Sequence, residues 1–375
     1  MIKKVFIICH VFLPTNNARS NRTFELAKEF ARLGNDVTIY AALGNYDYSK
    51  MEVEYNFKVK SIGELKIHNI NSDGKIKRNL FKTIFRYLFR PFFDFRELDL
   101  CYRTFQTIKR ELKEQPIDLI ISIAPPHSIN WGVSLYKYLN SKRSRIGLWV
   151  ADCGDPYMLN PFHKFKPPFY FKYVEKWFCR LVDYIIIPTE EGKNGYYKEF
   201  HSKIKVIPQG IDFSIAENLN PSSKNLVPTF IYSGALYKDK RDPKEFLDFL
   251  SSLVNIKFKF KIYTKQIELV NPYLETLNGK LEIHDYLSRD QLLQELSNSD
   301  FLVNIENIGG VQSPSKLIDY GLSKRPILSI DGQNIDKPKI LQFLNGDYSK
   351  KYEIDNFERF NIRMVAEQFL RLGEF

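Results

Sequence analysis

The stretch VFIICHVFLPTNNARSNRTFELAKEFARLGNDVTIY, Val5 to Tyr40, decides the fold class of this chain. It begins with an apolar run of strand length, passes through a polar loop and continues into an amphipathic helix. The apolar positions of that helix are Phe24, Ala27, Phe30 and Ala31. Gly34 ends the helix, and a second apolar strand follows. Buried strands joined by a helix predict a parallel sheet that is covered on both faces.

The same alternation continues along the whole chain in two series. Further strands of the first series are predicted at 117–124, 145–152, 182–189 and 203–209. The second series predicts strands at 229–234, 258–264, 281–286, 300–306 and 325–330, with amphipathic helices at 242–253 and 289–299. We therefore predict an α/β protein with two doubly wound, Rossmann-like domains that face each other across a cleft.

The predicted domain limits follow from a polar, Pro- and Ser-rich stretch. This stretch, NLNPSSKNLVP, is the most linker-like part of the chain and lies at 218–228, where the first series ends. We assign 1–217 to an N-terminal domain and 229–354 to a C-terminal domain. Residues 355–375 remain as a final helical segment.

Composition places the chain among globular proteins of two-domain size. Of its 375 residues, 44% are hydrophobic, and no run of about 18 apolar residues occurs, so no membrane-spanning segment is predicted. The apolar start lacks a small-residue cleavage site, and we interpret it as a strand rather than a signal peptide. Four cysteines without metal or redox spacing predict free thiols in a reducing cytoplasm.

The charge of the chain predicts an anionic partner. Net charge is +11, and much of the excess lies in KIKRNLFKTIFRYLFRPFFDFR, Lys75–Arg96. There Lys82, Arg86 and Arg90 follow one another at four-residue steps beside an apolar face. Such a helix suits the surface of an anionic membrane, but a surface helix that joins the core has the same pattern. Nucleic acid ranks behind both, because no nucleic-acid-binding motif accompanies the segment.

A second stretch, VQSPSKLIDYGLSKRPILSI (311–330), predicts a ligand site at a strand end. Ser313 suits the N-cap of a short helix, and its free N–H groups would favour a phosphate near Ser315 and Lys316. Asp319 lies one turn further on, in a position to accept hydrogen bonds from sugar hydroxyls. Taken alone, this fragment is explained more simply as a capped helix with a solvated acid.

The loop after the predicted strand 229–234 supplies further cations. GALYKDKRDP carries Lys238, Lys240 and Arg241 at a position that faces the same cleft in the predicted fold. Such groups would neutralise a diphosphate, and an arginine grips two oxygens at once. Three clustered cations are often only a solvated turn. Beside a phosphate-binding helix start, we favour the functional interpretation.

These segments, in this order, resemble the retaining nucleotide-sugar glycosyltransferases of the GT-B fold (family 4-like). The opening strand, loop and helix, VIPQGID at 206–212, YSGALYKDK at 232–240 and PSKLIDYGLSKRPILSI at 314–330 are similar to motifs of that family. LWVADCGDPY and ISIAPPHSINW resemble a subgroup that builds bacterial surface polysaccharides. The resemblance covers nearly the whole chain and implies that the helix in 355–375 packs back on the N-terminal domain.

The resemblance also implies roles for residues on the donor side. Asp319 matches the second of two paired glutamates, which binds the ribose, whereas Val311 stands where the first would be, with Glu306 as its substitute. Lys240 matches the lysine on the donor diphosphate, and Arg241 replaces an arginine whose position is taken by Ala235. The donor-binding residues predicted in full are Gly234, Glu306, Gly310, Ser313, Ser315, Lys316 and Asp319.

Residues after the strands of the first domain are predicted to contact the acceptor and the transferred sugar. His127 matches a histidine that often contacts that sugar, and with Lys240 and Arg241 it forms the predicted catalytic set. The predicted acceptor-side residues are Asn16, Asn17, Arg22, Asp152 and Asp155. Asn16 and Asn17 stand where the family usually has glycines. A helix-start histidine bonded to backbone, and turn or cap roles for the two aspartates, are the alternatives.

The resemblance implies sugar transfer with retention, in which a donor-phosphate oxygen deprotonates the incoming hydroxyl. No Asp-x-Asp and no ligand-spaced histidine pair occurs, so we expect neither metal nor cofactor, and Lys240, Arg241 and the helix start would stabilise the leaving diphosphate. We predict a cytoplasmic enzyme on the inner face of the membrane, with a nucleotide sugar and a lipid-linked saccharide as substrates. The alternatives are a nucleotide-sugar epimerase of similar fold and a non-catalytic glycan- or partner-binding paralogue.

Overall fold

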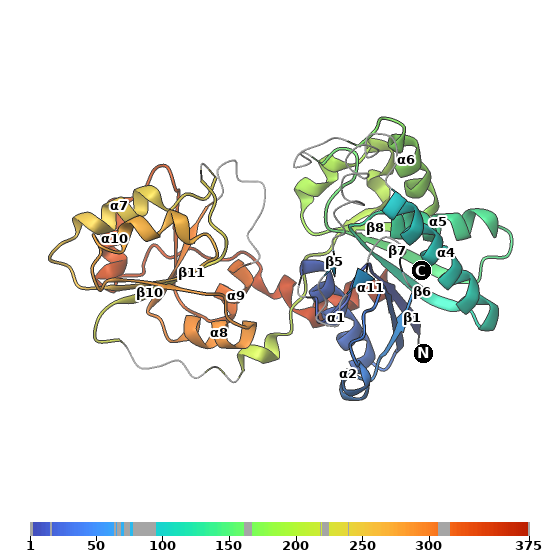
Figure 1. The fold of residues 1–375 in the computed structure, drawn as a ribbon, viewed down its shortest axis with the longest axis horizontal. Coiled ribbons are helices and arrows are strands. Elements are labelled where there is room, and N and C mark those ends of the chain that lie inside the picture. The colour runs from blue at the N-terminus through green and yellow to red at the C-terminus, as the bar shows by residue number, and fades with distance from the viewer. Residues whose placement is uncertain are drawn as a thin grey trace. The chain divides into compact units, whose positions relative to one another are not determined.

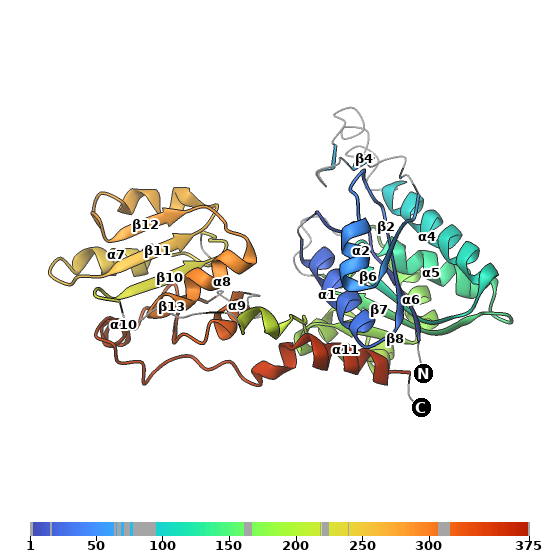
Figure 2. The ribbon, with the colours of Figure 1, turned by 90° about the horizontal axis from the view of Figure 1, so that it is seen from below.

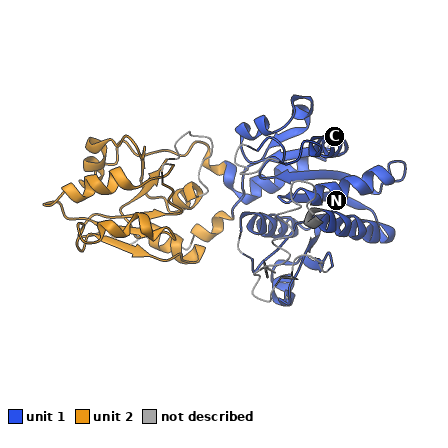
Figure 3. Cartoon of the chain, turned by 45° about the horizontal axis from the view of Figure 1, so that its top comes forward, with its two compact units in different colours: residues 1–211, 359–375 blue, residues 212–358 orange. Residues whose placement is uncertain are grey.

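Figure 1 shows a computed structural model of the chain. It describes residues 3–15, 17–63, 65, 69–70, 76–77, 95–160, 167–217, 219, 225–238, 240–306 and 316–373. The chain divides into two compact units, which Figure 3 colours separately: residues 1–211 with 359–375, and residues 212–358. The basic residues Lys82, Arg86 and Arg90, predicted to contact a membrane, lie outside the described residues.

Unit 1 is built on a seven-stranded sheet in which every neighbouring pair is parallel. The strand order is β3-β2-β1-β6-β7-β8-β9. The strands are β1 (Lys4–Ile8), β2 (Asp36–Ala41), β3 (Lys58–Ser61), β6 (Ile117–Ala124), β7 (Ile146–Cys153), β8 (Tyr184–Ile187) and β9 (Ile204–Val206). A separate antiparallel pair joins β4 (Asn69–Ile70) and β5 (Ile76–Lys77). Successive strands extend the sheet to one side of β1 as far as β3 and to the other side from β6 onward, so the strand order reverses between β1 and β6.

Helices cover both faces of this sheet, because alternate residues of its strands face opposite ways. Phe6 and Ile8 of β1 join one core cluster with residues of α4 (Phe95–Glu114), α5 (Ser128–Leu139) and α6 (Phe171–Leu181). Val5 and Ile7 join the other cluster with residues of α1 (Ala18–Arg32) and α11 (Ile362–Arg371). A further helix, α2 (Ser49–Tyr55), leads into β3. The result is a three-layer α/β unit.

The last helix, α11, belongs to unit 1 although unit 2 precedes it in the chain (Figure 2). Phe369 of α11 meets Phe30 of α1 edge to face, with ring centroids 6.4 Å apart. The Ile211 backbone N–H donates to the Phe360 carbonyl at 2.8 Å, and the Ile362 N–H donates to the Ile211 carbonyl at 2.9 Å. The chain therefore leaves and re-enters unit 1 at one hydrogen-bonded position.

Unit 2 contains a five-stranded parallel sheet of order β12-β11-β10-β13-β14. Its strands are β10 (Thr229–Ser233), β11 (Lys259–Tyr263), β12 (Leu281–His284), β13 (Phe301–Ile305) and β14 (Ile327–Ile330). Its helices are α7 (Lys244–Ser252), α8 (Arg289–Ser297), α9 (Lys316–Leu322) and α10 (Lys337–Leu344). The Phe230 ring stacks on Phe260 and on Phe301 of the flanking strands, each at 4.6 Å. In this sheet the strand order reverses between β10 and β13.

The predicted fold class is confirmed: two parallel sheets with Rossmann-like order form the GT-B fold. Each strand predicted from an apolar run is present. The short elements α2 and β3 were missed, because β3 has the sequence KVKS and is buried at none of its four residues. Among the described residues, no helix is both long enough and apolar enough to cross a bilayer.

Candidate functional site

The reversal point of unit 2, beyond the ends of β10 and β13, is where a doubly wound sheet binds its ligands. Gly234 follows β10 with a φ of +134°, a conformation that L side chains rarely adopt. The nearest atom to its missing Cβ position is the Cδ of Lys316, at 3.6 Å. Glycine thus turns the backbone away from β10 beside the first described residue of α9.

Lys316 is the most unusual residue at this edge. Its side chain is buried, and its Nζ has no hydrogen-bond partner among the described residues. The ammonium lies 4.1 Å from the ring centroid of Tyr232 and 5.8 Å from that of Tyr320. Burial, and secondly the positive charge of Arg241, hold the pKa of Lys316 well below its ordinary value. In the described part of the chain, no anion stabilises this buried cation.

Arg241 reaches the same position from the loop after β10. A tight turn brings it back, since the Arg241 backbone N–H donates to the Tyr237 carbonyl at 2.9 Å. Its Nη1 donates to the Ala235 carbonyl at 3.2 Å, which also accepts from the Tyr232 hydroxyl at 2.8 Å. Gly234, Arg241 and Lys316, all predicted donor-side residues, therefore come together. Lys240, by contrast, lies in the exposed part of the turn.

Glu306 follows β13 on the rim of this edge and is held by its neighbours. The Ser329 hydroxyl donates to Glu306 Oε1 at 2.7 Å, and Asn304 Nδ2 donates to Ser329 Oγ at 2.7 Å. Asn304 Oδ1 is buried without a partner in the described part of the chain. The other predicted donor residues here, Gly310, Ser313 and Ser315, lie outside the described residues.

Asp319 lies in α9 and is paired with a residue that the sequence analysis missed. Arg289, the first residue of α8, donates its Nε to Asp319 Oδ1 at 2.9 Å. Burial raises the pKa of Asp319, and the Arg289 guanidinium opposes that rise. The only sequence signal for Arg289 is its place directly after Ser288, the N-cap of a capping box. The pair fixes the carboxylate of Asp319 between two helices.

In unit 1, His127 is held where β6 and β7 end. Its side chain is buried, and its Nε2 donates to the Asp155 carbonyl at 2.9 Å. The imidazole also lies 5.3 Å from the ring of Tyr157. From the sequence, a backbone hydrogen bond was the alternative to sugar contact, and His127 makes such a bond. A contact with a sugar would then use its other ring nitrogen.

Arg22 and Asp152, two of the predicted acceptor-side residues, are paired with each other. Each side chain is only 2–3% exposed, and Arg22 Nε donates to Asp152 Oδ2 at 2.8 Å. Arg22 also donates to the Pro208 carbonyl. These contacts join α1, β7 and the segment after β9, so the pair supports the scaffold at this edge.

The loop before α1 contains a cap and an additional cation. Asn17 Oδ1 accepts from the backbone N–H groups of Arg19 and Ser20, both at 2.9 Å, so Asn17 is the N-cap of α1. The Arg19 guanidinium lies against Gly154, where a Cβ would be 2.4 Å from its carbon. The sequence analysis missed Arg19, because nothing local indicates that it reaches the end of β7. Asn16 lies outside the described residues.

A buried carboxyl lies beneath the same loop of unit 1. Glu175 of α6 is 1% exposed, and its Oε1 accepts from the Met158 backbone N–H at 3.4 Å. Its Oε2 has no partner in the described part of the chain. Burial raises the pKa of Glu175 to about 7, and hydrogen bonds from Met158 and Tyr157 oppose that rise. The side chain therefore anchors the loop after β7, which carries Asp155.

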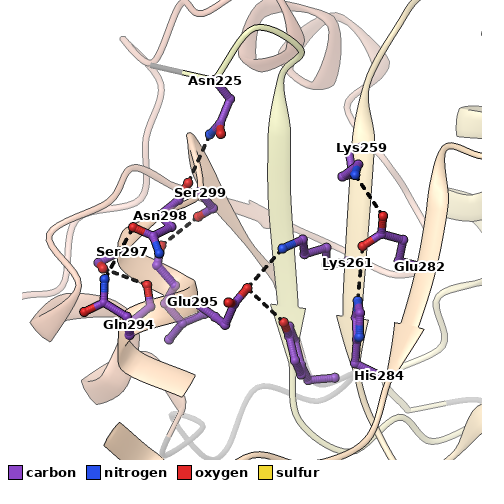
Figure 4. A network of polar contacts seen from close by, with 12 residues as sticks. Asn225, Lys259, Lys261, Glu282, His284, Gln294, Glu295, Ser297, Asn298 and Ser299 are labelled. Carbon is purple, nitrogen blue, oxygen red and sulfur yellow. Dashed lines mark hydrogen bonds and ion pairs between the residues drawn. The ribbon is translucent and has the colours of Figure 1, made fainter. Parts of the chain in front are cut away.

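A second polar network of unit 2 joins side chains of β11, β12 and α8 (Figure 4). Lys261 and Tyr263 both donate to Glu295 Oε2, at 3.0 and 3.1 Å, while Glu282 pairs with Lys259 and His284. An open pocket of about 480 Å³ beside this network is lined by residues that include Thr229 and Lys259, at the starts of their strands. Ligands of doubly wound sheets bind at the opposite strand ends, so this pocket is not the expected site.

Comparison with known proteins identifies a family for the first half of the chain. Residues 20–214 match the family model described as Glycosyltransferase Family 4. A search of curated proteins finds no match.

Solved structures share the fold over the whole chain. A glycosyltransferase from Rickettsia africae ESF-5 is similar, with a TM-score of 0.65 and 13% identity over 99% of this chain and 98% of that one. S. aureus TarM, in a complex with Fondaparinux, alpha-GlcNAc-glycerol and UDP, has a TM-score of 0.60 and 14% identity over 100% of both chains. A UDP-GlcNAc 2-epimerase from Neisseria meningitidis, bound to UDP-GlcNAc, has a TM-score of 0.51 and 12% identity over 98% of both chains. At these identities the likeness concerns the fold.

Proposed function

Since the chain belongs to glycosyltransferase family 4, we propose that it moves a sugar from a nucleotide diphosphate donor to a growing, lipid-linked bacterial surface glycan. The anomeric configuration of the sugar is retained. The donor binds at the reversal point of unit 2, and the acceptor binds at the corresponding edge of unit 1.

The observation that carries the donor assignment is the buried Lys316. Its ammonium is desolvated, lies beside the cationic Arg241 and lacks an acceptor among the described residues. A diphosphate would satisfy both cations at once, because its oxygens accept from the ammonium and the guanidinium together. TarM and the Neisseria epimerase, which share the fold, are solved with UDP and UDP-GlcNAc respectively, which supports a nucleotide ligand.

In the proposed reaction, cations stabilise the charge that develops on the leaving diphosphate. Arg241 and Lys316 lie where this charge forms, and Lys240 reaches it from the exposed turn. Such electrostatic stabilisation in a water-poor site is usually a large catalytic contribution. A donor-phosphate oxygen accepts the proton of the attacking hydroxyl, and His127 orients the sugar. The proposal includes no metal ion, and a rate unchanged by EDTA is the expected result.

Asp319 is proposed to bind the ribose of the donor. Asp319 lies in α9, one turn from Lys316 along the helix, and its carboxylate is held by Arg289 of α8. A charged acceptor that is held in place forms strong hydrogen bonds with vicinal hydroxyls. Glu306, fixed by Ser329 on the rim, is the proposed contact for the donor sugar.

A nucleotide-sugar epimerase is the second candidate, because the Neisseria epimerase shares the fold over 98% of both chains. An epimerase isomerises its nucleotide sugar without an acceptor, whereas a transferase leaves the sugar configuration of its free donor unchanged. Incubation with a nucleotide sugar alone, followed by separation of epimers, distinguishes the two. A non-catalytic paralogue would bind the donor and neither transfer nor hydrolyse it.

The experiment that tests the donor site is thermal stabilisation by nucleoside diphosphates. A ligand at a hundredfold its dissociation constant adds about 2.7 kcal/mol to the free energy of unfolding. We expect such a shift for wild-type protein and for the control variant Lys257→Met, which changes an exposed lysine before β11, and its loss in Lys316→Met. Full stabilisation of Lys316→Met would remove the observation on which the donor site rests.

A further inference from the structure

We propose that the outer face of α6, together with the residues before it, docks on an anionic lipid bilayer. This face, the α6 surface, consists of Phe169, Tyr170, Lys172, Tyr173, Lys176, Trp177 and Arg180. The inference goes beyond the proposed donor chemistry but rests on it in one respect, since a lipid-linked acceptor requires the enzyme to work at a membrane.

Large aromatic side chains are unusually exposed on the α6 surface. Phe169 is 74% exposed and Tyr173 61%, and Tyr138 at the end of α5, also 61% exposed, meets Trp177 edge to face at 6.2 Å. Scattered single apolar residues on a surface need no explanation, but neighbouring exposed aromatic rings mark an interaction site. Tyrosine and tryptophan in particular favour the boundary between water and lipid.

The charges of α6 fit an anionic surface. Its only acid, Glu175, is buried, whereas Arg180 is exposed and Lys172 is half-buried. Lys176 is also half-buried and pairs with Glu199 at 3.1 Å, so Lys172 and Arg180 carry the charge that is left for a lipid surface. Lys172 lies 4.8 Å from the ring of Tyr173, which places a cation beside an exposed aromatic ring. Basic side chains interleaved with aromatic ones suit the headgroup region, where the rings enter the interface and the cations meet lipid phosphates.

A continuous series of aromatic contacts connects this surface with the candidate site of unit 1. Tyr157 lies 5.3 Å from His127 and 5.5 Å from Phe171, measured between ring centroids. Phe171 then contacts Tyr170 at 4.9 Å, and Tyr170 contacts Phe169 at 5.9 Å. The exposed end of α6 is therefore beside the edge where the acceptor is proposed to bind. Docking through α6 would present that edge to saccharides anchored in the bilayer.

The α6 surface is distinct from the basic segment 75–96, for which the sequence leaves membrane contact and packing on the core as alternatives. It lies in the described part of unit 1, where Phe169 and Tyr170 directly precede α6 and Tyr173 is exposed on it. The α6 surface can therefore be tested by itself, with the basic segment unchanged.

The test is co-sedimentation of the full chain with vesicles of phosphatidylethanolamine and phosphatidylglycerol, and with vesicles of phosphatidylcholine alone. We expect the wild type to bind the anionic vesicles more strongly. Phe169→Ser combined with Tyr173→Ser should lower the partition coefficient about tenfold or more, since it removes two interfacial rings. The matched control, Val53→Ser with Val254→Ser, changes residues that are 85% and 77% exposed elsewhere and should bind like the wild type.

A second variant tests the charges without altering the rings. Lys172→Gln with Arg180→Gln should weaken binding to anionic vesicles roughly tenfold and make the remaining binding less sensitive to salt. Unchanged vesicle binding in both double variants would overturn the proposal. A wild-type dimer that dissociates in the Phe169 and Tyr173 variant would also overturn it, because a second copy of the chain would then cover this surface.

Nucleotide-induced stabilisation, measured on the same preparations, separates this inference from the proposed donor site. Retained stabilisation with no vesicle binding by the wild type would refute the α6 surface and leave the donor site intact. Vesicle binding that depends on α6, with no nucleotide stabilisation, would support the α6 surface and refute the donor site.

Discussion

Two buried basic residues, Arg22 in unit 1 and Lys316 in unit 2, show opposite arrangements. Arg22 is paired with Asp152 and donates to the Pro208 carbonyl, so its charge is compensated within the protein. Lys316 lies over an aromatic ring, beside another cation, and its Nζ lacks a partner among the described residues. A compensated buried charge supports the scaffold, whereas an uncompensated one indicates a position for a ligand.

Removing one member of the pair of Arg22 and Asp152 should have the largest effect on stability. Arg22→Met leaves the Asp152 carboxylate buried and unpaired, and we expect it to lower the free energy of unfolding by about 3–5 kcal/mol. Urea denaturation measures the loss. Arg22→Met combined with Asp152→Leu should recover much of it, because no uncompensated charge then remains. A loss near zero in the single variant would show that the pair is not structural.

In unit 2, replacing the buried basic residue is expected to raise the free energy of unfolding rather than lower it. Lys316→Met removes an uncompensated buried cation and should raise the stability of the ligand-free protein by about 2 kcal/mol at neutral pH. Because the folded-state pKa of Lys316 is lowered, the wild type gains stability as pH rises towards the ordinary lysine pKa, and the difference from the variant shrinks. Thermal unfolding across alkaline pH measures this convergence. A constant difference would contradict the assigned cause.

Glu175 is the acidic counterpart in unit 1 of the buried Lys316, because its pKa is also shifted by burial. Its pKa is raised by burial to about 7, so the folded protein binds an extra proton between the ordinary glutamate pKa and that value. Stability attributable to Glu175 therefore falls as pH rises through this window. Glu175→Gln should be more stable than the wild type by about 2–3 kcal/mol above pH 7. The two proteins should become equal in strong acid, as measured by denaturation at several pH values.

The smallest expected effect concerns Asp319, whose charge is compensated by Arg289 and is also proposed to meet the ligand. Asp319→Asn should weaken binding of a nucleoside diphosphate about tenfold, because a charge-assisted bond to the ribose becomes a neutral one. Isothermal titration calorimetry measures the affinity. The 2′- and 3′-deoxynucleotides serve as controls, since a loss that is equal for ribose and deoxyribose ligands would exclude contact with those hydroxyls.

The fold could be predicted from the sequence because local patterns determine it. Each strand of the two parallel sheets, apart from β3, is a short apolar run. The helix α1 shows its buried face in the spacing of Phe30 and its neighbours. Order along the chain then fixed the class, since strands that alternate with helices form parallel sheets.

The sequence could predict that Gly234, Arg241 and Lys316 lie at one edge, because the strand ends of a doubly wound sheet meet there. It could not predict the contacts of individual side chains. The pairing of Arg22 with Asp152 joins residues 130 positions apart, and no local pattern reports such a contact. Arg289 and Arg19 were missed for the same reason. Burial of a charge is a property of the packed structure, so Lys316 could be located but not recognised as uncompensated.

The return of the chain to unit 1 through α11 has a consequence for synthesis on the ribosome. Val365 and Phe369 belong to the same core cluster as Val5 and Ile7, so the cover that α1 begins on this face of the first sheet is complete only after residues 359–373 have been made. Unit 2 lies wholly between these segments and can complete its own core earlier. Unit 1 is thus begun first and completed last. Until α11 has been made, the α1 side of unit 1 exposes apolar surface to which chaperones can bind.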